Sequence, residues 1–323
     1  MFQWGIMATG KIAHQFADTL RVVDGAVLGA VGSRSRQGAE AFAAEYAGKY
    51  PGLRAYGSYE ELVKDPQIDA VYVCTPNAMH PASIRLCLEA GRHVLCEKPF
   101  APTAAEAEAL FDLAERRGLF LMEGMWIAQL PLIQKMRRLL AGGALGQVRH
   151  LRAEYGFIGS GVRLERKLSR ELAGGALMDV GCYTLAFARL AFGDEPQNIQ
   201  SLARLGESGT DIYSASILDF GGGRTALLTS TIGAVIPVEG YICGDKGSLY
   251  LPNFQAAQKL IYRPQGGSEQ VFEEPFCSSG FEYEIKDAMA SIEAGRRQSS
   301  FWGREDTLAI ARQIDALHGM WGQ

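Results

Sequence analysis

The chain has 323 residues, of which 47% are hydrophobic and 21% are charged, a composition typical of a soluble globular protein and not of a disordered or fibrous one. This length favours two domains over one. The formal net charge of −4 gives no basic surface that could neutralise a phosphate backbone, so nucleic acid is not expected as a partner.

Cysteine and histidine spacing argues against disulfide and metal chemistry. The six cysteines form no C-x-x-C pair and several lie inside apolar runs, which predicts reduced core thiols in a reducing compartment. The five histidines form no i, i+4 pair, so no metal site is expected. The N-terminus lacks the basic segment of a signal peptide, and no stretch approaches the roughly 18 apolar residues of a membrane span. We therefore expect a cytoplasmic protein without a membrane partner.

The first third of the chain alternates short β-branched runs with helical patterns. This alternation predicts right-handed βαβ units, and hence an α/β Rossmann domain with a doubly wound parallel sheet over residues 1–122. The predicted strands are 2–7, 26–32, 70–74, 93–96 and 119–122, and the predicted helices are 11–20, 36–46, 58–63, 82–90 and 103–117.

Residues 123–323 follow a different pattern, which predicts a C-terminal α+β domain. Its alternating runs indicate an open, mainly antiparallel mixed sheet with helices on one face. Between two of these runs, Asp219–Arg224 contains three glycines and predicts a hairpin turn. The predicted strands are 147–157, 211–220, 224–232, 238–243 and 247–251, and the predicted helices are 131–141, 281–294 and 305–317.

A dinucleotide fingerprint lies between the first predicted strand and helix. It is Ala8-x-Gly10-x-x-Ala13, with alanine at the position of the first glycine. Gly10 would let the backbone approach a pyrophosphate at the helix N-terminus, and Ala13 would let helix and strand pack closely. The alternative is a plain strand-turn-helix built from small residues. The expected cofactor contacts in this turn are Ala8, Thr9, Gly10, Lys11 and Ile12.

The end of the second predicted strand indicates which dinucleotide is bound. An NAD enzyme carries an acidic residue there for the ribose diol, whereas this chain has Ser33 and Arg34. A hydroxyl and a guanidinium suit the 2′-phosphate of NADP. The sequence therefore predicts NADP(H) as the preferred cofactor, with NAD(H) possible; the alternative is a solvated arginine at a helix start.

Three further segments complete a recognisable set: Val73–His80 (VCTPNAMH), Gly91–Pro99 (GRHVLCEKP) and Gly174–Tyr183 (GGALMDVGCY). With the N-terminal turn, they resemble the Gfo/Idh/MocA oxidoreductases over nearly the whole chain. The resemblance implies a Rossmann domain followed by an open-faced mixed sheet, through which family members often dimerise. We therefore expect a homodimer or a higher homo-oligomer. The resemblance extends the expected cofactor contacts to Thr75, Pro76, Asn77, His80, Glu97 and Lys98.

The resemblance also implies the active-site residues. The lysine of the family's Glu-Lys-Pro motif corresponds to Lys98, and its D-x-G-x-H/Tyr motif corresponds to Asp179 and Tyr183. Tyrosine at the last position is similar to the glucose-fructose oxidoreductase and dihydrodiol dehydrogenase branch. The chain departs from that branch at Ala128, where those relatives commonly carry arginine, so part of the usual polar contact to substrate is not expected.

The residues themselves are suited to acid-base chemistry. Tyr183 could exchange a proton with a substrate hydroxyl if a cation brought its pKa, ordinarily about 10, nearer to neutrality, and Lys98 is the candidate cation. Asp179 lies four residues before Tyr183, so on a helix the two would share a face and the carboxylate could hold the Lys98 ammonium. Taken singly, Lys98 could be a solvated charge and Asp179 a helix N-cap. The peptide before Pro99 could be cis.

Three other side chains are open to two interpretations each. His80 either contacts the substrate or caps the next helix. Arg166 either meets a substrate hydroxyl or phosphate or forms a surface salt bridge. Trp126 either stacks on a sugar ring or is a core aromatic. With Asp179 and Tyr183, Trp126 and Arg166 are the candidate substrate contacts.

Taken together, these features predict an NADP(H)-dependent oxidoreductase. It would transfer hydride between nicotinamide and a secondary alcohol or carbonyl of a sugar, polyol or cyclic diol, with Lys98 and Tyr183 as the acid-base pair and Asp179 as the residue that orients them. Two alternatives on the same fold are an NAD-dependent glycoside hydrolase and a non-catalytic dinucleotide-sensing regulator. Retention of all three residues argues against the regulator, and the Arg34 signal argues against the hydrolase.

Overall fold

The computed structural model describes residues 1–323, except for the side chains of Val162 and Arg163, and it divides into two compact units. The first unit is Met1–Trp126 with Cys277–Thr307, and the second is Ile127–Phe276 with Leu308–Gln323. The sequence pattern assigned residues 277–307 to the second domain. In the structure these residues pack with the first unit, because helix α9 lies against helix α1.

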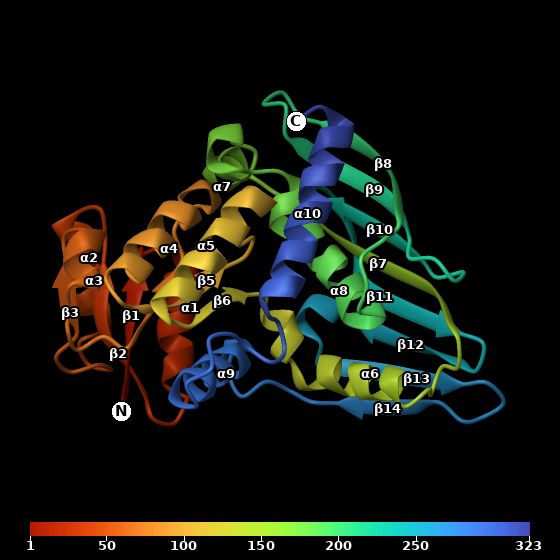
Figure 1. The fold of residues 1–323 in the computed structure, drawn as a ribbon, viewed down its shortest axis with the longest axis horizontal. Coiled ribbons are helices and arrows are strands. Elements are labelled where there is room, and N and C mark those ends of the chain that lie inside the picture. The colour runs from red at the N-terminus through yellow and green to blue at the C-terminus, as the bar shows by residue number, and fades with distance from the viewer. The chain divides into compact units, whose positions relative to one another are not determined.

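The first unit contains a six-stranded sheet of order β3-β2-β1-β4-β5-β6, and every neighbouring pair is parallel. Helices cover it as in a doubly wound fold (Figure 1), as the sequence predicted. The strands are β1 (Phe2–Met7), β2 (Ala26–Gly32), β3 (Arg54–Tyr56), β4 (Ala70–Val73), β5 (His93–Glu97) and β6 (Leu121–Gly124). The helices are α1 (Lys11–Leu20), α2 (Arg36–Tyr46), α3 (Tyr59–Val63), α4 (His80–Glu89), α5 (Ala104–Arg117) and α9 (Phe281–Glu293).

Burial explains why the central strands are continuous apolar runs. Strand β4 is buried at every position and β1 at all but one, as expected when helices cover both faces of a parallel sheet. Strand β6 begins two residues later than predicted and ends at Gly124. Its Glu123 is nearly fully buried and accepts hydrogen bonds from the Trp302 indole (2.9 Å), the Thr307 hydroxyl (2.9 Å) and the Phe100 amide (3.1 Å). One carboxylate therefore ties β6 to the loop after β5 and to the start of helix α10 (Arg304–Trp321).

The second unit contains an eight-stranded sheet of order β14-β13-β12-β11-β7-β10-β9-β8. Strands β7 and β10 pair in parallel and the other pairs are antiparallel, which confirms the predicted mixed, mainly antiparallel sheet. The strands are β7 (Val148–Ile158), β8 (Asn198–Leu205), β9 (Asp211–Asp219), β10 (Thr225–Thr231), β11 (Gly233–Gly244), β12 (Gly247–Pro252), β13 (Lys259–Pro264) and β14 (Gln270–Glu273). Its helices are α6 (Pro131–Ala141), α7 (Gly161–Lys167) and α8 (Cys182–Phe192), together with most of α10.

A helix covers one face of this sheet. Helix α8 packs against β7 and β10 on one face (Figure 1).

The β9–β10 hairpin turns through Gly221, Gly222 and Gly223, all at positive φ, as the sequence predicted. Strands β8, β13 and β14 were not predicted, because their polar residues obscure the alternation.

One apolar stretch resembles a membrane span by composition, although the sequence predicted none. By length and hydropathy alone, the stretch Arg170–Phe192 could cross a membrane. However, 78% of the most apolar window is buried inside the unit, which is the behaviour of a core helix.

The six thiols are all free, but they are not all in the core. Cys74, Cys87, Cys96 and Cys182 are buried, and burial raises the pKa of the first three well above the ordinary thiol range. Cys277 is exposed in the segment before α9, so the prediction of a core thiol is wrong at that position.

Candidate active site

The turn between β1 and α1 leaves a helix end open to a ligand. Gly10 is the N-cap of α1, and no side chain caps the helix. A Cβ built on Gly10 would meet no protein atom within 4 Å, so open space lies beside these amides. Ala8 has a φ of 103°, a conformation that favours glycine, which explains why the fingerprint places glycine at this point. The geometry fits a pyrophosphate held by backbone amides at a helix N-terminus.

The residues that follow β2 differ in their contacts. Ser35 caps helix α2, because its hydroxyl accepts the Gly38 amide at 3.2 Å. Arg36 pairs with Glu61 at 2.9 Å. Arg34 is exposed and makes no ion pair with any described side chain, but its charge acts on the neighbouring Tyr59 phenol. Arg34 is therefore available to a ligand, whereas Arg36 is engaged.

His80 is a buried bridge between two of the sequence motifs. Its Nδ1 lies 2.8 Å from the Pro99 carbonyl oxygen and its Nε2 lies 2.9 Å from the Thr75 carbonyl oxygen. The N-cap of α4 is Met79, so, of the two interpretations left open for His80, the one as the cap of this helix is wrong. Burial lowers the pKa of His80 below its ordinary 6.5, with the Lys98 charge acting in the same direction and the two carbonyls opposing it. The ring joins the loop after β4 to the loop after β5.

Lys98 lies in a loop whose backbone is fixed directly after the lysine. The Lys98–Pro99 peptide is cis, one of the two possibilities considered from the sequence. The Pro99 carbonyl meets the His80 ring, and the Phe100 amide donates to Glu123. Thr75, which precedes Pro76 and Asn77, is buried, and its hydroxyl meets Ser83 at 3.2 Å.

The residue before Lys98, Glu97, lies near one buried carboxyl group, that of Glu284. The Tyr72 hydroxyl donates to the Glu97 carboxylate. Burial raises the pKa of Glu97, while the Tyr72 hydrogen bond and the Lys98 charge lower it. Glu284 on α9 is fully buried, and neither of its carboxylate oxygens has a hydrogen-bond partner among the described residues. Burial, followed by the charges of Glu97 and Asp287, raises the pKa of Glu284 well above its usual value. Sequence reasoning missed Tyr72 and Glu284, since both look like ordinary positions of a strand and a helix.

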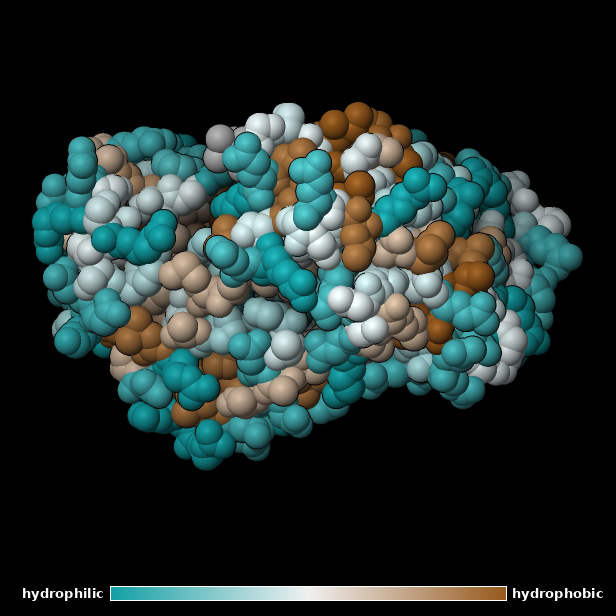
Figure 2. All heavy atoms as spheres, turned by 90° about the horizontal axis from the view of Figure 1, so that it is seen from above, coloured by the Kyte–Doolittle hydropathy of each residue, from teal (hydrophilic) through white to brown (hydrophobic). Residues whose placement is uncertain are grey.

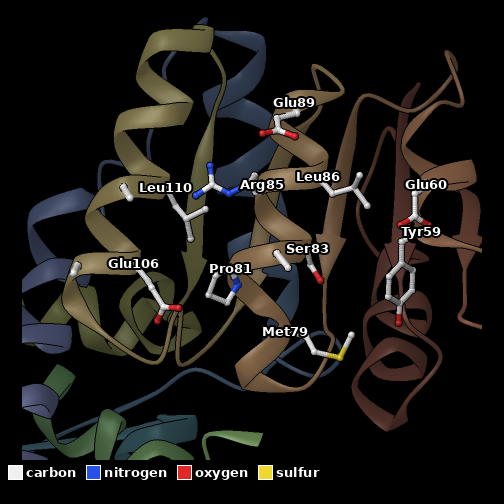
Figure 3. A pocket seen from close by; sticks show the side chains of 13 residues that line it. Tyr59, Glu60, Met79, Pro81, Ser83, Arg85, Leu86, Glu89, Glu106 and Leu110 are labelled. Atoms are coloured by element: carbon white, nitrogen blue, oxygen red, sulfur yellow. The ribbon is translucent and has the colours of Figure 1, made fainter. Parts of the chain in front are cut away.

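A cavity of about 820 Å³ opens elsewhere in the first unit, between α4, α5 and the start of α3 (Figure 3). Its lining includes Tyr59, Met79, Arg85, Glu89, Glu106 and Leu110. The turn at Gly10 is not part of this lining, so this cavity is not the predicted dinucleotide site. Among the described residues, no group of three His, Cys, Asp or Glu side chains could hold a metal ion.

The second unit carries the other predicted catalytic residues. Asp179 lies in a π-helix, Leu177–Gly181, and Tyr183 lies in the first turn of the following helix α8. The Lys167 ammonium forms an ion pair with Asp179 and lies 4.5 Å from the centroid of the Phe157 ring. The Tyr183 ring is buried and packs 5.9 Å from the Tyr155 ring. Sequence reasoning missed Lys167, because nothing in the spacing indicates that a lysine twelve residues earlier returns to Asp179.

The remaining candidates differ in their surroundings. Trp126 is buried and packs edge-on against Phe281, with 5.4 Å between ring centroids, which is the core-aromatic arrangement. Arg166 is exposed and forms no ion pair with a described side chain, so the expected surface salt bridge is not present there. Ala128 is fully buried, and its carbonyl accepts a hydrogen bond from the Gln134 amide.

Comparison with known proteins places this geometry in a family. Residues 2–125 match the oxidoreductase family with an NAD-binding Rossmann fold, and residues 133–250 match the GFO/IDH/MocA C-terminal domain. The trans-1,2-dihydrobenzene-1,2-diol dehydrogenase of Xenopus tropicalis is 34% identical over 325 residues, covering 97% of this chain and 96% of that protein. The human enzyme of the same name is 33% identical over 307 residues, covering 92% and 90%.

Solved structures agree with this assignment. The aldose-aldose oxidoreductase of Caulobacter crescentus, complexed with glycerol, superposes with a TM-score of 0.89 at 26% identity, covering 98% of this chain and 96% of that one. A 3-ketoreductase from Actinomadura kijaniata, solved with NADP, superposes with a TM-score of 0.83 at 24% identity, covering 98% and 97%, which shows the fold alone.

The chain therefore belongs to the Gfo/Idh/MocA family of oxidoreductases, which confirms the resemblance in its motifs. It is an NAD(P)-dependent dehydrogenase that acts on CH–OH groups.

The His80 bridge can be tested by unfolding. We expect His80→Leu to lower the free energy of unfolding by about 1–3 kcal/mol at pH 7, because a buried carbonyl loses its donor. The folded pKa of His80 lies below 6.5, so its contribution is present above pH 6.5 and is lost as the pH falls through the folded pKa. Urea unfolding at several pH values should therefore show the gap between the two proteins narrowing toward acid.

The matched control is His150→Leu on β7, where the ring makes no hydrogen bond to any described residue. This change should stay within about 0.5 kcal/mol. Equal effects of the two substitutions at every pH would show that the His80 contacts contribute nothing.

Proposed function

We propose that the protein transfers hydride between NADP(H) and a secondary alcohol or carbonyl of a sugar, polyol or cyclic diol. The observation that carries this proposal is the loop of Lys98, whose flanking backbone is held by two buried side chains, His80 and Glu123. Such rigid support is what a positioned active-site cation requires. The names of the dihydrodiol dehydrogenase and aldose-aldose oxidoreductase relatives support a cyclic diol or carbohydrate-like substrate.

The residues expected to hold the dinucleotide lie in the first unit. The amides at Gly10, Lys11 and Ile12 would bind the pyrophosphate, with Ala8 and Thr9 shaping the turn. Arg34 and Ser33 would take the 2′-phosphate, and the loop from Thr75 to Asn77 would line the site farther along. When bound, the nicotinamide supplies or accepts the hydride.

The proton would be handled by Lys98 and Tyr183. In the oxidising direction the tyrosine oxygen takes the substrate hydroxyl proton as the carbon gives up hydride, and in the reducing direction it returns that proton. The Lys98 ammonium lowers the pKa of the phenol and stabilises negative charge on the reacting oxygen. Asp179 orients this pair. Its ion pair with Lys167 fixes the carboxylate in place.

Cofactor preference gives a prediction with an internal control. Arg34→Ala should weaken NADP(H) binding by about 1.5–3 kcal/mol, the range for a charge-assisted hydrogen bond, and leave NAD(H) nearly unchanged. Arg36→Ala should have a smaller effect, because that guanidinium is paired with Glu61. Fluorescence titration of both variants with both cofactors measures this. Equal losses for NADP(H) and NAD(H) in Arg34→Ala would contradict the assignment.

The acid-base pair predicts a non-additive double mutant. Tyr183→Phe should lower turnover by about 10²–10⁴-fold without weakening NADPH binding, because only the proton-transferring hydroxyl is lost. Lys98→Ala should lose at least as much. The double mutant should be little worse than the poorer single mutant, since the two groups act as one unit.

The readout is NADPH absorbance at 340 nm with a panel of sugars, polyols and diols. Multiplicative losses, or full turnover of Tyr183→Phe on its best substrate, would mean that the proton moves by another route.

We also propose that the open face of the eight-stranded sheet joins a second copy of this chain. Ile217 and Leu227 lie directly opposite each other on this face and are 47% and 37% exposed. Next to them on the same face, Arg152 pairs with Glu239 at 2.8 Å and lies over the Tyr241 ring. Figure 2 shows that hydrophobic residues gather in patches among hydrophilic ones on the face of the molecule seen in that view. A mixed apolar and hydrogen-bonded surface suits an interface between copies.

Light scattering should therefore show a dimer or larger oligomer at micromolar concentration. Ile217→Lys should shift the protein toward monomer, because a charge at the centre of an apolar contact is left desolvated. Val22→Lys, at a similarly exposed site after α1, should leave the mass unchanged. A wild-type monomer would rule out this association.

A further inference from the structure

The segment that carries Asp179 and Tyr183 is closed into a tight loop. The Gly175 amide donates to the Lys167 carbonyl at 2.7 Å, and the Lys167 ammonium pairs with Asp179. A Cβ on Gly174 would lie 2.1 Å from the Lys167 carbonyl oxygen, so only glycine fits there. The loop therefore closes through both the backbone and the side chain of Lys167.

Asp211 holds the start of the π-helix through a hydrogen bond to its backbone. It is the first residue of β9, it is fully buried, and its Oδ2 accepts the Leu177 amide at 2.7 Å. Its Oδ1 has no hydrogen-bond partner among the described residues. A Cβ on Gly175, which has a φ of 123°, would lie 2.2 Å from that oxygen. The carboxylate and the loop are thus fitted to each other, and Leu177 is the first residue of the helical turn that contains Asp179.

Burial destabilises the charged form of Asp211, and two backbone amides stabilise it. Burial raises its pKa to about 6, while the Leu177 amide and its own amide lower it. The charged side chains on the surrounding elements are Lys167 and Asp179, which pair with each other, and Arg170, which lies beside Gly209. None of them contributes to the shift. Strand β10 faces the π-helix with Ser230, which is uncharged.

We propose that Asp211 is a positioning residue whose carboxylate fixes the π-helix, and that proton uptake by Asp211 loosens the placement of Asp179 and Tyr183. A carboxylate accepts an amide hydrogen bond about twice as strongly as a neutral group does, and negative charge is favoured at a helix N-terminus. The effect on turnover rests on the proposed roles of Asp179 and Tyr183. The effect on the π-helical segment itself, measured by hydrogen exchange, does not rest on those roles.

The sign of the stability effect separates this role from a merely structural one. The folded pKa lies above the ordinary value of 3.8, so the contribution of Asp211 to stability is present below that value and is lost as the pH rises through about 6. At pH 7 the charged Asp211 carboxylate therefore lowers the free energy of unfolding. Asp211→Asn, which cannot ionise, should be no less stable than wild type at pH 7 and should still turn over more slowly.

The experiment compares amide hydrogen exchange in residues 176–182 with turnover, across pH 5–8. The matched control is Asp219→Asn at the other end of β9, an exposed aspartate that also accepts a backbone amide, from Gly221 at 2.8 Å. At pH 7, Asp211→Asn should exchange about fivefold faster in this segment than wild type or the control, the ratio expected when a charged hydrogen bond becomes neutral. After correction for intrinsic exchange, these amides in wild type should lose the same protection as the pH falls below about 6. In Asp211→Asn the corrected exchange rate should not depend on pH in this way.

Turnover gives the second readout. In wild type, kcat should fall below about pH 6, this limb should be missing from Asp211→Asn, and NADPH binding should be the same in both. Unchanged protection in Asp211→Asn, or protection in wild type that does not depend on pH, would overturn the inference. If protection changes but Tyr183→Phe keeps full turnover, the positioning by Asp211 stands and the proposed acid-base pair fails. Should Asp211→Asn not fold, the pH dependence of wild-type protection decides alone.

Discussion

The hydrogen bonds of the loop after β5 are the constraint on which the catalytic proposal depends. Glu123 accepts the Phe100 amide and also binds the Trp302 indole and the Thr307 hydroxyl, while His80 contacts the Pro99 carbonyl. Buried polar groups cost free energy unless they are paired, and here the pairing fixes the chain at Lys98. The returning segment of residues 277–307 is needed because it supplies two of these donors.

In the second unit, contacts between different elements fix the position of Asp179. Asp179 belongs to a π-helix, a rare element that is common at functional sites. Its place is set by three contacts: the Lys167 ammonium on the carboxylate, the Lys167 carbonyl on the Gly175 amide, and the Asp211 carboxylate on the Leu177 amide. Each contact joins residues on different elements, so the turn is determined by packing and not by local helix propensity.

Both units place acidic groups where water is excluded. In the first unit Glu284 is buried close to Glu97, and in the second Asp211 is buried at the start of the π-helix. Burial raises the pKa of all three carboxyl groups. Such groups reduce stability at neutral pH, so a fold selected for stability alone would not keep them. Their position beside the predicted catalytic residues is consistent with stability given up for a fixed geometry.

The sequence alone determined the class of fold and the family. Strand-helix alternation, the Gly10 turn and the ordered motifs around Lys98, Asp179 and Tyr183 are local patterns, and the parallel sheet and the mixed sheet follow from them. Only the tertiary structure decided that His80 is a bridge between loops, that Ser35 is the cap of α2, and that residues 277–307 return to the first unit. It also decided the partners of Asp179 and Asp211. These are contacts between residues far apart in the chain, and no local spacing encodes which buried donor reaches which acceptor.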